Sequence, residues 1–162
     1  MALTVGYEHC VALKEDGTLQ AWGLNDYGQT NVPVGLSNVV SLAVGRTHNL
    51  ALRADGTVVG WGFNRAGQAT GIANTNAISV SSGEVSVEGR VLTDVAAIAA
   101  GRGYSLAIKK DGTVVGWGRM VNDQYPVTVP EGLSNVVAIS AGESFCLAIT
   151  TNRAVAERFG AK

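Results

Sequence analysis

The sequence predicts an all-β protein built from short antiparallel sheets that repeat along the chain. Two observations in the composition support this fold class. Glycine supplies 21 of the 162 residues, and only 15% of the residues are charged, against about 25% in an average soluble domain. Together with only three prolines, this composition excludes a helical bundle and a highly charged disordered chain. It is typical of many short strands joined by tight turns.

A third observation, an internal repeat, decides how the strands are grouped. Four segments begin with a glycine and continue with the same pattern of residue types. Their leading glycines, 39, 56 and 41 residues apart, are Gly6, Gly45, Gly101 and Gly142. The first three segments contain Asp-Gly-Thr and end in Trp-Gly, at Asp16, Asp55 and Asp111 and at Trp22, Trp61 and Trp117. The fourth has lost both, with Arg158-Phe159 at the Trp-Gly place.

The second unit shows the layout that the units share. The aliphatic run 39–44 is strand-like and ends at Gly45, where we expect a tight bend or a positive φ. A second short strand at 49–52 leads to the Asp-Gly pair, which predicts a two-residue hairpin turn of type I′. A third strand follows at 57–61. Three antiparallel strands about every 40 residues predict the blades of a β-propeller, with the Val-Pro connector able to add a fourth short strand.

The chain is interpreted as one repeat domain of four blade units. These units cover residues 2–40, 41–96, 97–137 and 138–162. The second unit is longer than its neighbours, and its extra residues fall in the polar stretch 70–86. This stretch predicts a surface loop or an additional hairpin.

The repeat also resembles a known family. The pattern Gly-x-x-His-x-x-Ala-Leu-x-x-Asp-Gly-x-Val-x-x-Trp-Gly, followed by Gly-Gln at 28–29 and 67–68, resembles the regulator-of-chromosome-condensation repeat. The third unit has Asp123-Gln124 in place of Gly-Gln. The resemblance covers nearly the whole chain and implies a propeller that usually closes with seven blades. The connectors Val-Pro-x-Gly-Leu-Ser-Asn, at 32–38 and 129–135, look bacterial and are similar to a compact type that includes a proteinaceous β-lactamase inhibitor.

Four units amount to a half-propeller, and this length predicts assembly. Each blade buries both faces against its neighbours, so an open arc leaves two apolar sheet faces in water. We therefore expect a homodimer in which two chains, related by a two-fold axis, close a ring of seven or eight blades. A closed four-bladed monomer and an exchange of strands between chains are the alternatives.

No residue set in the sequence predicts catalysis, and no metal or cofactor is expected. His9 and His48 share a repeat position with Tyr104 and Phe145, which favours a packing or strand-capping role over metal binding. The repeat keeps the turn aspartates far apart, so they are expected to serve the hairpin turns. No nucleotide-binding glycine motif, zinc motif or nucleophile–base pair is present.

The cysteines and tryptophans are interpreted as core residues. Cys10 and Cys146 share one repeat position, and two free buried thiols are expected. A Cys10–Cys146 bridge across chains is the alternative, because blades one and four adjoin in a ring closed by two chains. The tryptophans stand at a fixed register, which favours the core over a ligand platform.

Charge and hydropathy exclude several partners. The formal net charge is −1, so the basic surplus of a nucleic-acid-binding protein is absent. No run of 18 apolar residues is present, which excludes a membrane-spanning helix. The N-terminus lacks the basic and apolar regions of a signal peptide, and the localisation of this soluble chain is left open.

Function is predicted to lie in the loops that vary on the repeated frame. Residues directly after each leading glycine are expected on one rim of the propeller, together with a second set that begins one or more residues beyond Trp-Gly, at 25–27, 64–65 and 120–123. The candidate partner-binding residues are Tyr7, Glu8, Arg46, Thr47, Arg102, Glu143, Tyr27 and Arg65. Arg and Tyr are favoured interface anchors, although ordinary solvated loops have similar sequences.

We therefore predict a non-enzymatic scaffold that self-assembles and binds a protein partner through its rim loops. One alternative is a structural self-association module, or a propeller fragment, without a ligand of its own. The others are a β-lactamase-inhibitor-like protein and an enzyme built on a propeller.

Overall fold

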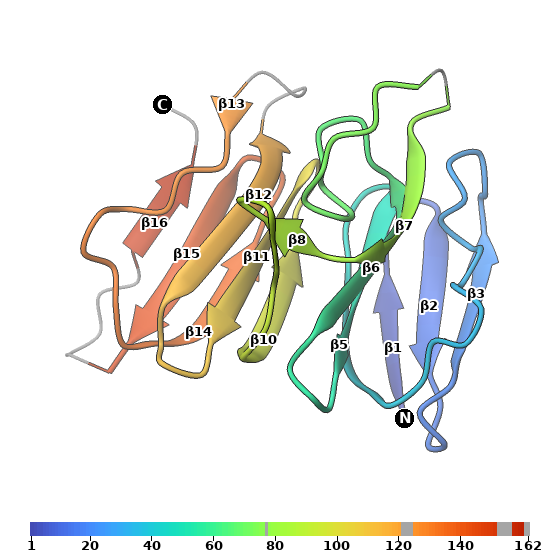
Figure 1. Ribbon diagram of the computed structural model, residues 1–162, viewed down its shortest axis with the longest axis horizontal. Helices are drawn as coiled ribbons and strands as arrows, with labels where there is room; N and C mark the ends of the chain where they lie inside the picture. The colour runs from blue at the N-terminus through green and yellow to red at the C-terminus, as the bar shows by residue number, and fades with distance from the viewer. Residues whose placement is uncertain (77, 121–124, 152–156, 161–162) are drawn as a thin grey trace.

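Four antiparallel sheets lie side by side (Figure 1). The last residues of their first strands line a common hollow. The computed structural model describes residues 1–76, 78–120, 125–151 and 157–160. Over these residues the chain forms strands and turns but no helix, and therefore no helix that could span a membrane. The prediction of an all-β fold made of blade-like sheets is confirmed.

Each sheet is a blade whose strands pair in the order of the chain. Blade 1 consists of β1 (Ala2–Val5), β2 (His9–Leu13) and β3 (Leu19–Gly23). Blade 2 consists of β4 (Val39–Val44), β5 (His48–Arg53), β6 (Val58–Phe63) and β7 (Val80–Glu84). Blade 3 consists of β10 (Val95–Ala100), β11 (Tyr104–Lys109), β12 (Val114–Met120) and β13 (Tyr125–Pro126). Blade 4 consists of β14 (Val136–Ala141), β15 (Phe145–Thr150) and β16 (Glu157–Gly160).

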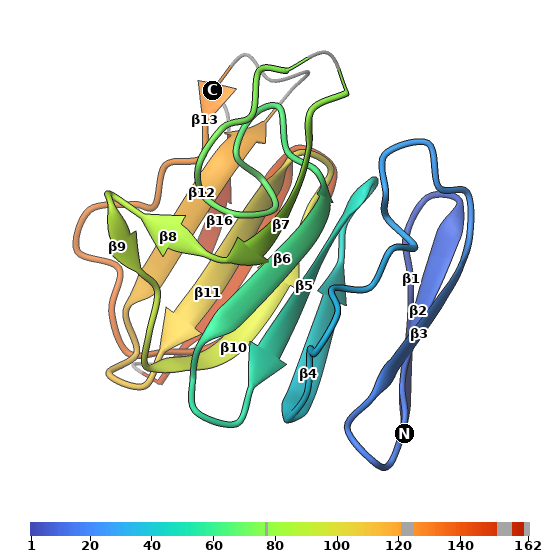
Figure 2. The ribbon, with the colours of Figure 1, turned by 45° about the vertical axis from the view of Figure 1, so that its right-hand side comes forward.

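The longer second unit supplies extra strands. β7 lies within the stretch 70–86 and pairs with β6 as the fourth strand of blade 2. A small separate hairpin, β8 (Ser86–Val87) with β9 (Arg90–Val91), follows directly and projects beside β12 in the rotated view (Figure 2).

The same strand register recurs in every blade. In blade 1 the Trp-Gly pair lies opposite the start of the second strand, as Cys10↔Trp22 and His9↔Gly23, and blades 2 and 3 repeat this pairing. In blade 4, Phe159 and Gly160 occupy the same places opposite Cys146 and Phe145. The alignment of Arg158 with tryptophan was therefore wrong by one residue, because the fourth unit has one residue more between the paired positions.

The hairpin turns at the Asp-Gly pairs are not of type I′. Gly17 and its two counterparts have a positive φ, but the aspartates before them do not. The Gly17 N–H donates to the Lys14 carbonyl (3.1 Å), and the Lys14 N–H donates to the Thr18 carbonyl (2.9 Å). Each turn is therefore a three-residue loop, made of a type I turn followed by a left-handed glycine. The Asp16 carboxylate also accepts from the N–H and hydroxyl of Thr18. This contact explains why the motif is Asp-Gly-Thr.

The leading glycines are required by the spacing between blades. None of the four has a positive φ, so that part of the expectation was wrong. A Cβ added to Gly6 would lie 2.7 Å from the carbonyl oxygen of Gly45, and one added to Gly101 would lie 2.7 Å from that of Gly142. Each added Cβ would also overlap the ring of the residue three positions later in its own blade, which is Tyr104 for Gly101. Only glycine allows consecutive blades to approach this closely.

The connectors also join consecutive blades at the opposite edge, where the Asp-Gly turns lie. The residues before β4, β10 and β14 adopt left-handed φ values of 57°, 59° and 55°, and are Asn38, Asp94 and Asn135. Directly after two of them, the N–H groups of Val95 and Val136 donate to the carbonyls of Gly56 and Gly112 in the preceding blades, both at 3.0 Å. Asparagine and aspartate tolerate this conformation better than most residues, which explains their place in the repeated connector.

The hydrophobic core lies between blades. Three clusters of buried side chains fill the contacts between blades 1 and 2, blades 2 and 3, and blades 3 and 4. Five of the six residues in each of the second strands β5 and β11 are buried, whereas burial alternates along β2 and β15. The end blades are thus packed on one face, and the middle blades on both.

Replacement of a leading glycine is expected to destabilise the fold. Gly101→Ala places a Cβ against Tyr104 and the Gly142 carbonyl, which should cost about 2–3 kcal/mol of unfolding free energy as overpacking. Gly132→Ala is the control, because nothing lies within 4 Å of its Cβ position and only its φ of +80° is unfavourable, at about 1 kcal/mol. Urea unfolding measures both, and equal losses would contradict the close-approach argument.

Candidate functional site

A side-chain contact recurs between consecutive blades at one position of the repeat. We name His9, His48, Tyr104 and Phe145 the clasp position, and the following residues, Cys10, Asn49, Ser105 and Cys146, the receiving position. The His9 Nε2 lies 2.8 Å from Oδ1 of Asn49, and the His48 Nε2 lies 2.9 Å from Oγ of Ser105. The clasp residue of one blade therefore contacts the receiving residue of the next.

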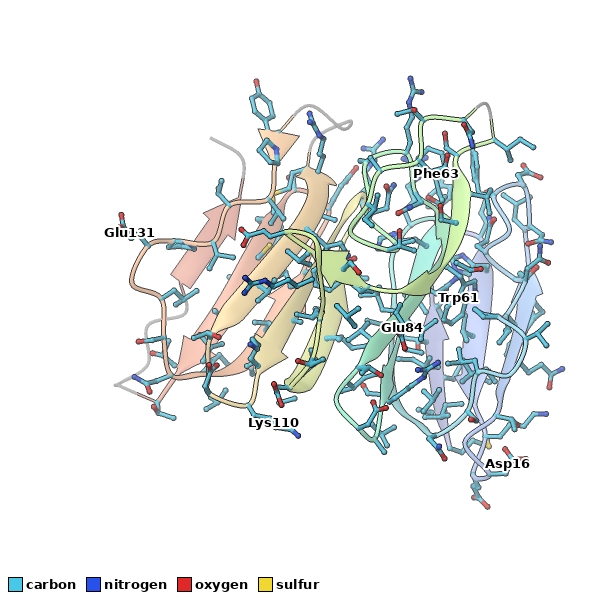
Figure 3. All side chains as sticks on the ribbon, in the orientation of Figure 1. Asp16, Trp61, Phe63, Glu84, Lys110 and Glu131 are labelled. Carbon is cyan, nitrogen blue, oxygen red and sulfur yellow. The ribbon has the colours of Figure 1, made fainter. Side chains whose placement is uncertain are left out.

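The receiving residues are tied in turn to the Gly-Gln loop of the preceding blade. The carbonyl of Gln29 accepts from Asn49 Nδ2 (2.9 Å) and Trp61 Nε1 (3.1 Å). The carbonyl of Gln68 accepts in the same way from Ser105 Oγ and Trp117 Nε1. Trp61 points into the contact between blades 1 and 2 (Figure 3). These tryptophans bridge blades, whereas Trp22 of blade 1 is 46% exposed.

These bonds determine the protonation of the two histidines. Asn49 offers an oxygen, and the Ser105 hydroxyl already donates to Gln68, so each histidine must donate from Nε2. The buried Nδ1 atoms of His9 and His48 have no hydrogen-bond partner among the described residues. Protonation of Nδ1 would bury a charge without an acceptor. Burial lowers the pKa of His48 to about 3, with a smaller contribution from His9, and burial also lowers the pKa of His9.

In blade 3 the clasp is a tyrosine. The Tyr104 hydroxyl donates to the backbone carbonyls of Gly142 (2.9 Å) and Phe145 (2.8 Å) in blade 4. Burial and the adjacent Cys146 raise the Tyr104 pKa, and burial raises the pKa of the Cys146 thiol to about 11. Both groups are therefore neutral at physiological pH.

The residues directly after the leading glycines gather around the hollow lined by the first strands. This hollow has a volume of about 540 Å³, and Tyr7, Arg46, Arg102 and Glu143 line it together. The Arg46 guanidinium lies 4.7 Å from the ring centre of Tyr7. The Arg102 Nη1 lies 2.5 Å from the Glu143 Oε1. Four predicted candidates from four blades are thus brought together.

A second hollow of about 460 Å³ adjoins the first and shares Tyr7, Arg46 and Arg102 with it. Glu8, Thr47 and Tyr27 also line it. Arg65, the last of the candidate rim residues, lines neither hollow.

The second hollow is also lined by Leu24, Phe63 and Arg119, which were not among the candidate residues. All three directly follow Trp-Gly, so their shared repeat position was the signal that could have found them. Their backbone N–H groups donate to Glu8, Thr47 and Gly103 at 2.8–2.9 Å, which holds them on the rim. The ring of Phe63 also meets Tyr27 edge to face at 4.7 Å.

The turn aspartates lie at the edge opposite this rim. Asp16 and Lys110, both in hairpin turns, stand at one edge of the arc, and Phe63 stands at the other (Figure 3). Hydrogen bonds from Thr18, Thr57 and Thr113 lower the pKa of the three turn aspartates. Within the residues that the structure describes, no three His, Cys, Asp or Glu side chains are grouped to hold a metal ion.

The outward faces of the end blades form two further surfaces. We name the outward face of blade 1 the leading face, and it contains Leu3, Val5, Cys10, Ala12 and Trp22. We name the outward face of blade 4 the trailing face, and it contains Phe145, Leu147 and Ile149. Leu3 and Val5 are each 62% exposed, and Ile149 is 51% exposed. The described arc is therefore open between blades 1 and 4.

The two cysteines project from the same side of their blades, toward the preceding blade, but only Cys146 has a blade packed against it. Cys10 is half-buried on the leading face, whereas Cys146 is fully buried against blade 3 beside Tyr104. Both thiols are free. In a ring closed by two chains, the residue facing Cys10 would come from the trailing face, which Cys146 does not share. This geometry disfavours the alternative of a Cys10–Cys146 bridge.

The repeated blades define a β-propeller protein, and comparison with known proteins identifies the family. Residues 2–29, 39–68 and 95–124 match the model of the regulator of chromosome condensation (RCC1) repeat. These segments make up more than half of the chain. The protein therefore belongs to the RCC1-repeat family. A search by sequence finds no match among curated proteins.

Solved structures show the same fold. The chain is similar to yeast RCC1 (Prp20) in its complex with Kap60, with 23% identity and a TM-score of 0.73 over 93% of this chain and 41% of that one. It is similar to Prp20p from Saccharomyces cerevisiae, with 24% identity and a TM-score of 0.73 over 93% and 43% of the two chains. It is also similar to human WBSCR16, with 21% identity and a TM-score of 0.72 over 93% and 46%. The chain spans less than half the length of these neighbours.

The stability of the protein is expected to fall as the pH drops below about 6.5. The folded pKa of His48 is about 3, against 6.5 when unfolded, so in this window the unfolded chain binds a proton that the folded chain does not. His48 should then remove up to about 1.4 kcal/mol of unfolding free energy per pH unit, and nothing above the window. Urea unfolding at several pH values measures the slope.

The variant His48→Tyr, which copies the clasp of blade 3, should flatten this slope. The contribution of His9 remains in the variant, so the difference between the two profiles isolates His48. If the unfolding free energy of wild type and variant falls with the same slope as the pH drops, His48 is not the cause of that slope.

Proposed function

We propose that this chain is a non-enzymatic propeller scaffold that binds a protein partner through its rim and assembles through its end faces. The observation that carries the rim proposal is Arg46. Its guanidinium lies over Tyr7 between the two hollows, and it makes no ion pair within the described part of the chain. A guanidinium held over a ring retains donors for a carboxylate or carbonyl of a partner.

The composition of the rim supports a protein partner. Arginine and aromatic side chains, which dominate the energetics of protein interfaces, line the second hollow as Arg46, Arg102, Tyr7, Tyr27 and Phe63. These residues vary from blade to blade, while the strands that carry them keep one register. A rigid frame with variable loops is the arrangement that repeat proteins use for binding.

The relatives support a binding role by analogy. The yeast protein crystallised with Kap60, and a second study of the same protein concerns its binding to Gsp1p and histones. We propose neither nucleic acid nor membrane as a direct partner, because the formal net charge of this chain is −1.

Self-association is a second candidate function, favoured by the two end faces. Leu3 and Val5 on the leading face, and Leu147 and Ile149 on the trailing face, are apolar and exposed. In the middle blades the equivalents of Leu147 and Ile149 are buried and those of Leu3 and Val5 are half-buried. Contiguous apolar surface of this kind is typical of interaction sites. A module whose role is assembly alone would need only these faces.

Removal of the rim arginines should abolish partner capture without unfolding the protein. The immobilised wild type and the double variant Arg46→Ala/Arg102→Ala are compared as baits in lysate of the organism of origin. The matched control is Lys109→Ala/Lys110→Ala, which removes the same charge from the opposite edge. We expect proteins captured by wild type and control but lost from the rim variant, followed by direct titration of the purified partner.

The exposed Arg102–Glu143 pair contributes only about 0–1 kcal/mol to stability, so the rim variant should unfold at nearly the wild-type urea concentration. Equal capture by all three baits would contradict rim binding and leave self-association as the favoured function.

A further inference from the structure

The trailing face and the leading face match each other as two halves of an interface that the chain already contains. Between blades 3 and 4, Tyr104, Leu106 and Ile108 pack against Cys146 and Ala148. On the trailing face the same repeat positions hold Phe145, Leu147 and Ile149, and on the leading face they hold Cys10 and Ala12. The two faces therefore carry the same two sets of residue types that pack together between blades 3 and 4, an aromatic residue with leucine and isoleucine on one side and a cysteine with an alanine on the other.

The other two interfaces have a different chemistry. Between blades 1 and 2 the clasp pair is His9 with Asn49, and between blades 2 and 3 it is His48 with Ser105. Both pairs are polar and hydrogen-bonded. The pair of Phe145 with Cys10 has no hydrogen bond to make through its side chains. Its nearest equivalent is Tyr104 with Cys146, where the tyrosine hydroxyl also bonds to backbone carbonyls.

We propose that the trailing face of one copy docks on the leading face of a second copy, with Phe145 over Cys10. This inference rests on the self-assembly part of the proposed function and specifies its geometry. Two copies related by a two-fold axis along the common hollow would form this seam twice, so that every blade is packed on both faces. The seam would cover Leu3, Val5, Leu147 and Ile149, which are exposed in the single chain.

The residues at the clasp and receiving positions would also determine which blades can adjoin. A histidine clasp over Cys10 would bury a donor opposite a poor acceptor, and Phe145 over Asn49 would bury the Oδ1 of Asn49 without a donor. The seam therefore favours the joining of blade 4 to blade 1 over the other combinations. Phe145 and Cys10 act here as specificity-determining residues of the assembly.

Light scattering coupled to size exclusion tests whether the chain assembles at all. We expect a mass of two chains, and Leu147→Asp should raise the dimer dissociation constant by about 100-fold or more, because the seam would bury its charge. The matched control is Val34→Asp, since Val34 is a fully exposed apolar residue of the connector in blade 1. A wild type that stays monomeric overturns both the seam and the self-assembly proposal, while rim binding stands.

Exchange of the clasp pair tests the seam itself. Phe145→His and Cys10→Ser should each weaken the dimer by about tenfold, because each leaves a buried polar group without a partner. The double variant reproduces the His48–Ser105 pair, and should recover to within about threefold of the wild type if the two residues meet. If these substitutions leave the dimer dissociation constant unchanged, the proposed seam is wrong, although self-assembly is not.

Cross-linking identifies which chains meet. In Phe145→Cys, a short bismaleimide should join the new thiol to Cys10 of another copy and give a covalent dimer, while Cys10→Ala in the same background should give none. Cys146 is fully buried and should not compete. A cross-link within one chain would overturn the proposal in favour of a closed four-bladed ring. Circular dichroism of each variant confirms that it is folded before its mass is interpreted.

Discussion

The packing of one blade face on the next is the contact on which the whole structure depends. A three-stranded sheet has too little surface to bury its own apolar side chains, and here the core consists of the clusters between blades. The leading glycines keep the blades in contact near the hollow, and the left-handed connectors keep them in contact at the opposite edge. The rim follows from this packing, because the loops around the hollow are positioned by strands that the contacts hold rigid.

Much of the fold could be predicted from the sequence, because the same pattern of strands and turns occurs in several copies along the chain. The first three strands of blades 1 to 3 were recognisable from their apolar residues and from their places before the leading glycine, between it and the Asp-Gly pair, and after that pair. The turn type was not recognisable, since Asp-Gly is compatible with both type I′ and type I plus a left-handed glycine, and the bond from Thr18 to Asp16 decides between them. The role of the leading glycines was also hidden, because the atom that excludes a Cβ belongs to the neighbouring blade.

The candidate site, too, could be predicted only in part. Its residues were found largely by asking where the repeat varies, and Arg46, Arg102, Tyr7 and Glu143 do lie together around one hollow. Their pairing was not predictable, because stacking of Arg46 on Tyr7 and bonding of Arg102 to Glu143 depend on which blades adjoin and at what spacing. Arg65 follows the same sequence rule and lines neither hollow, since a loop position fixes an edge of the blade but not the direction of a side chain.

The clasp has a consequence for how such chains change in evolution. Each contact joins a fixed position in one blade to a fixed position in the next, so every unit carries both halves of an interface. Duplication or deletion of a whole unit therefore leaves two faces that still match in register, and only the pair of residues at the new junction must adapt. Chain length can then vary in steps of one blade at little structural cost. Within this chain the replacement of histidine by tyrosine and phenylalanine at the clasp, accompanied by cysteine at the receiving position of blade 4, shows the kind of paired substitution that each step requires.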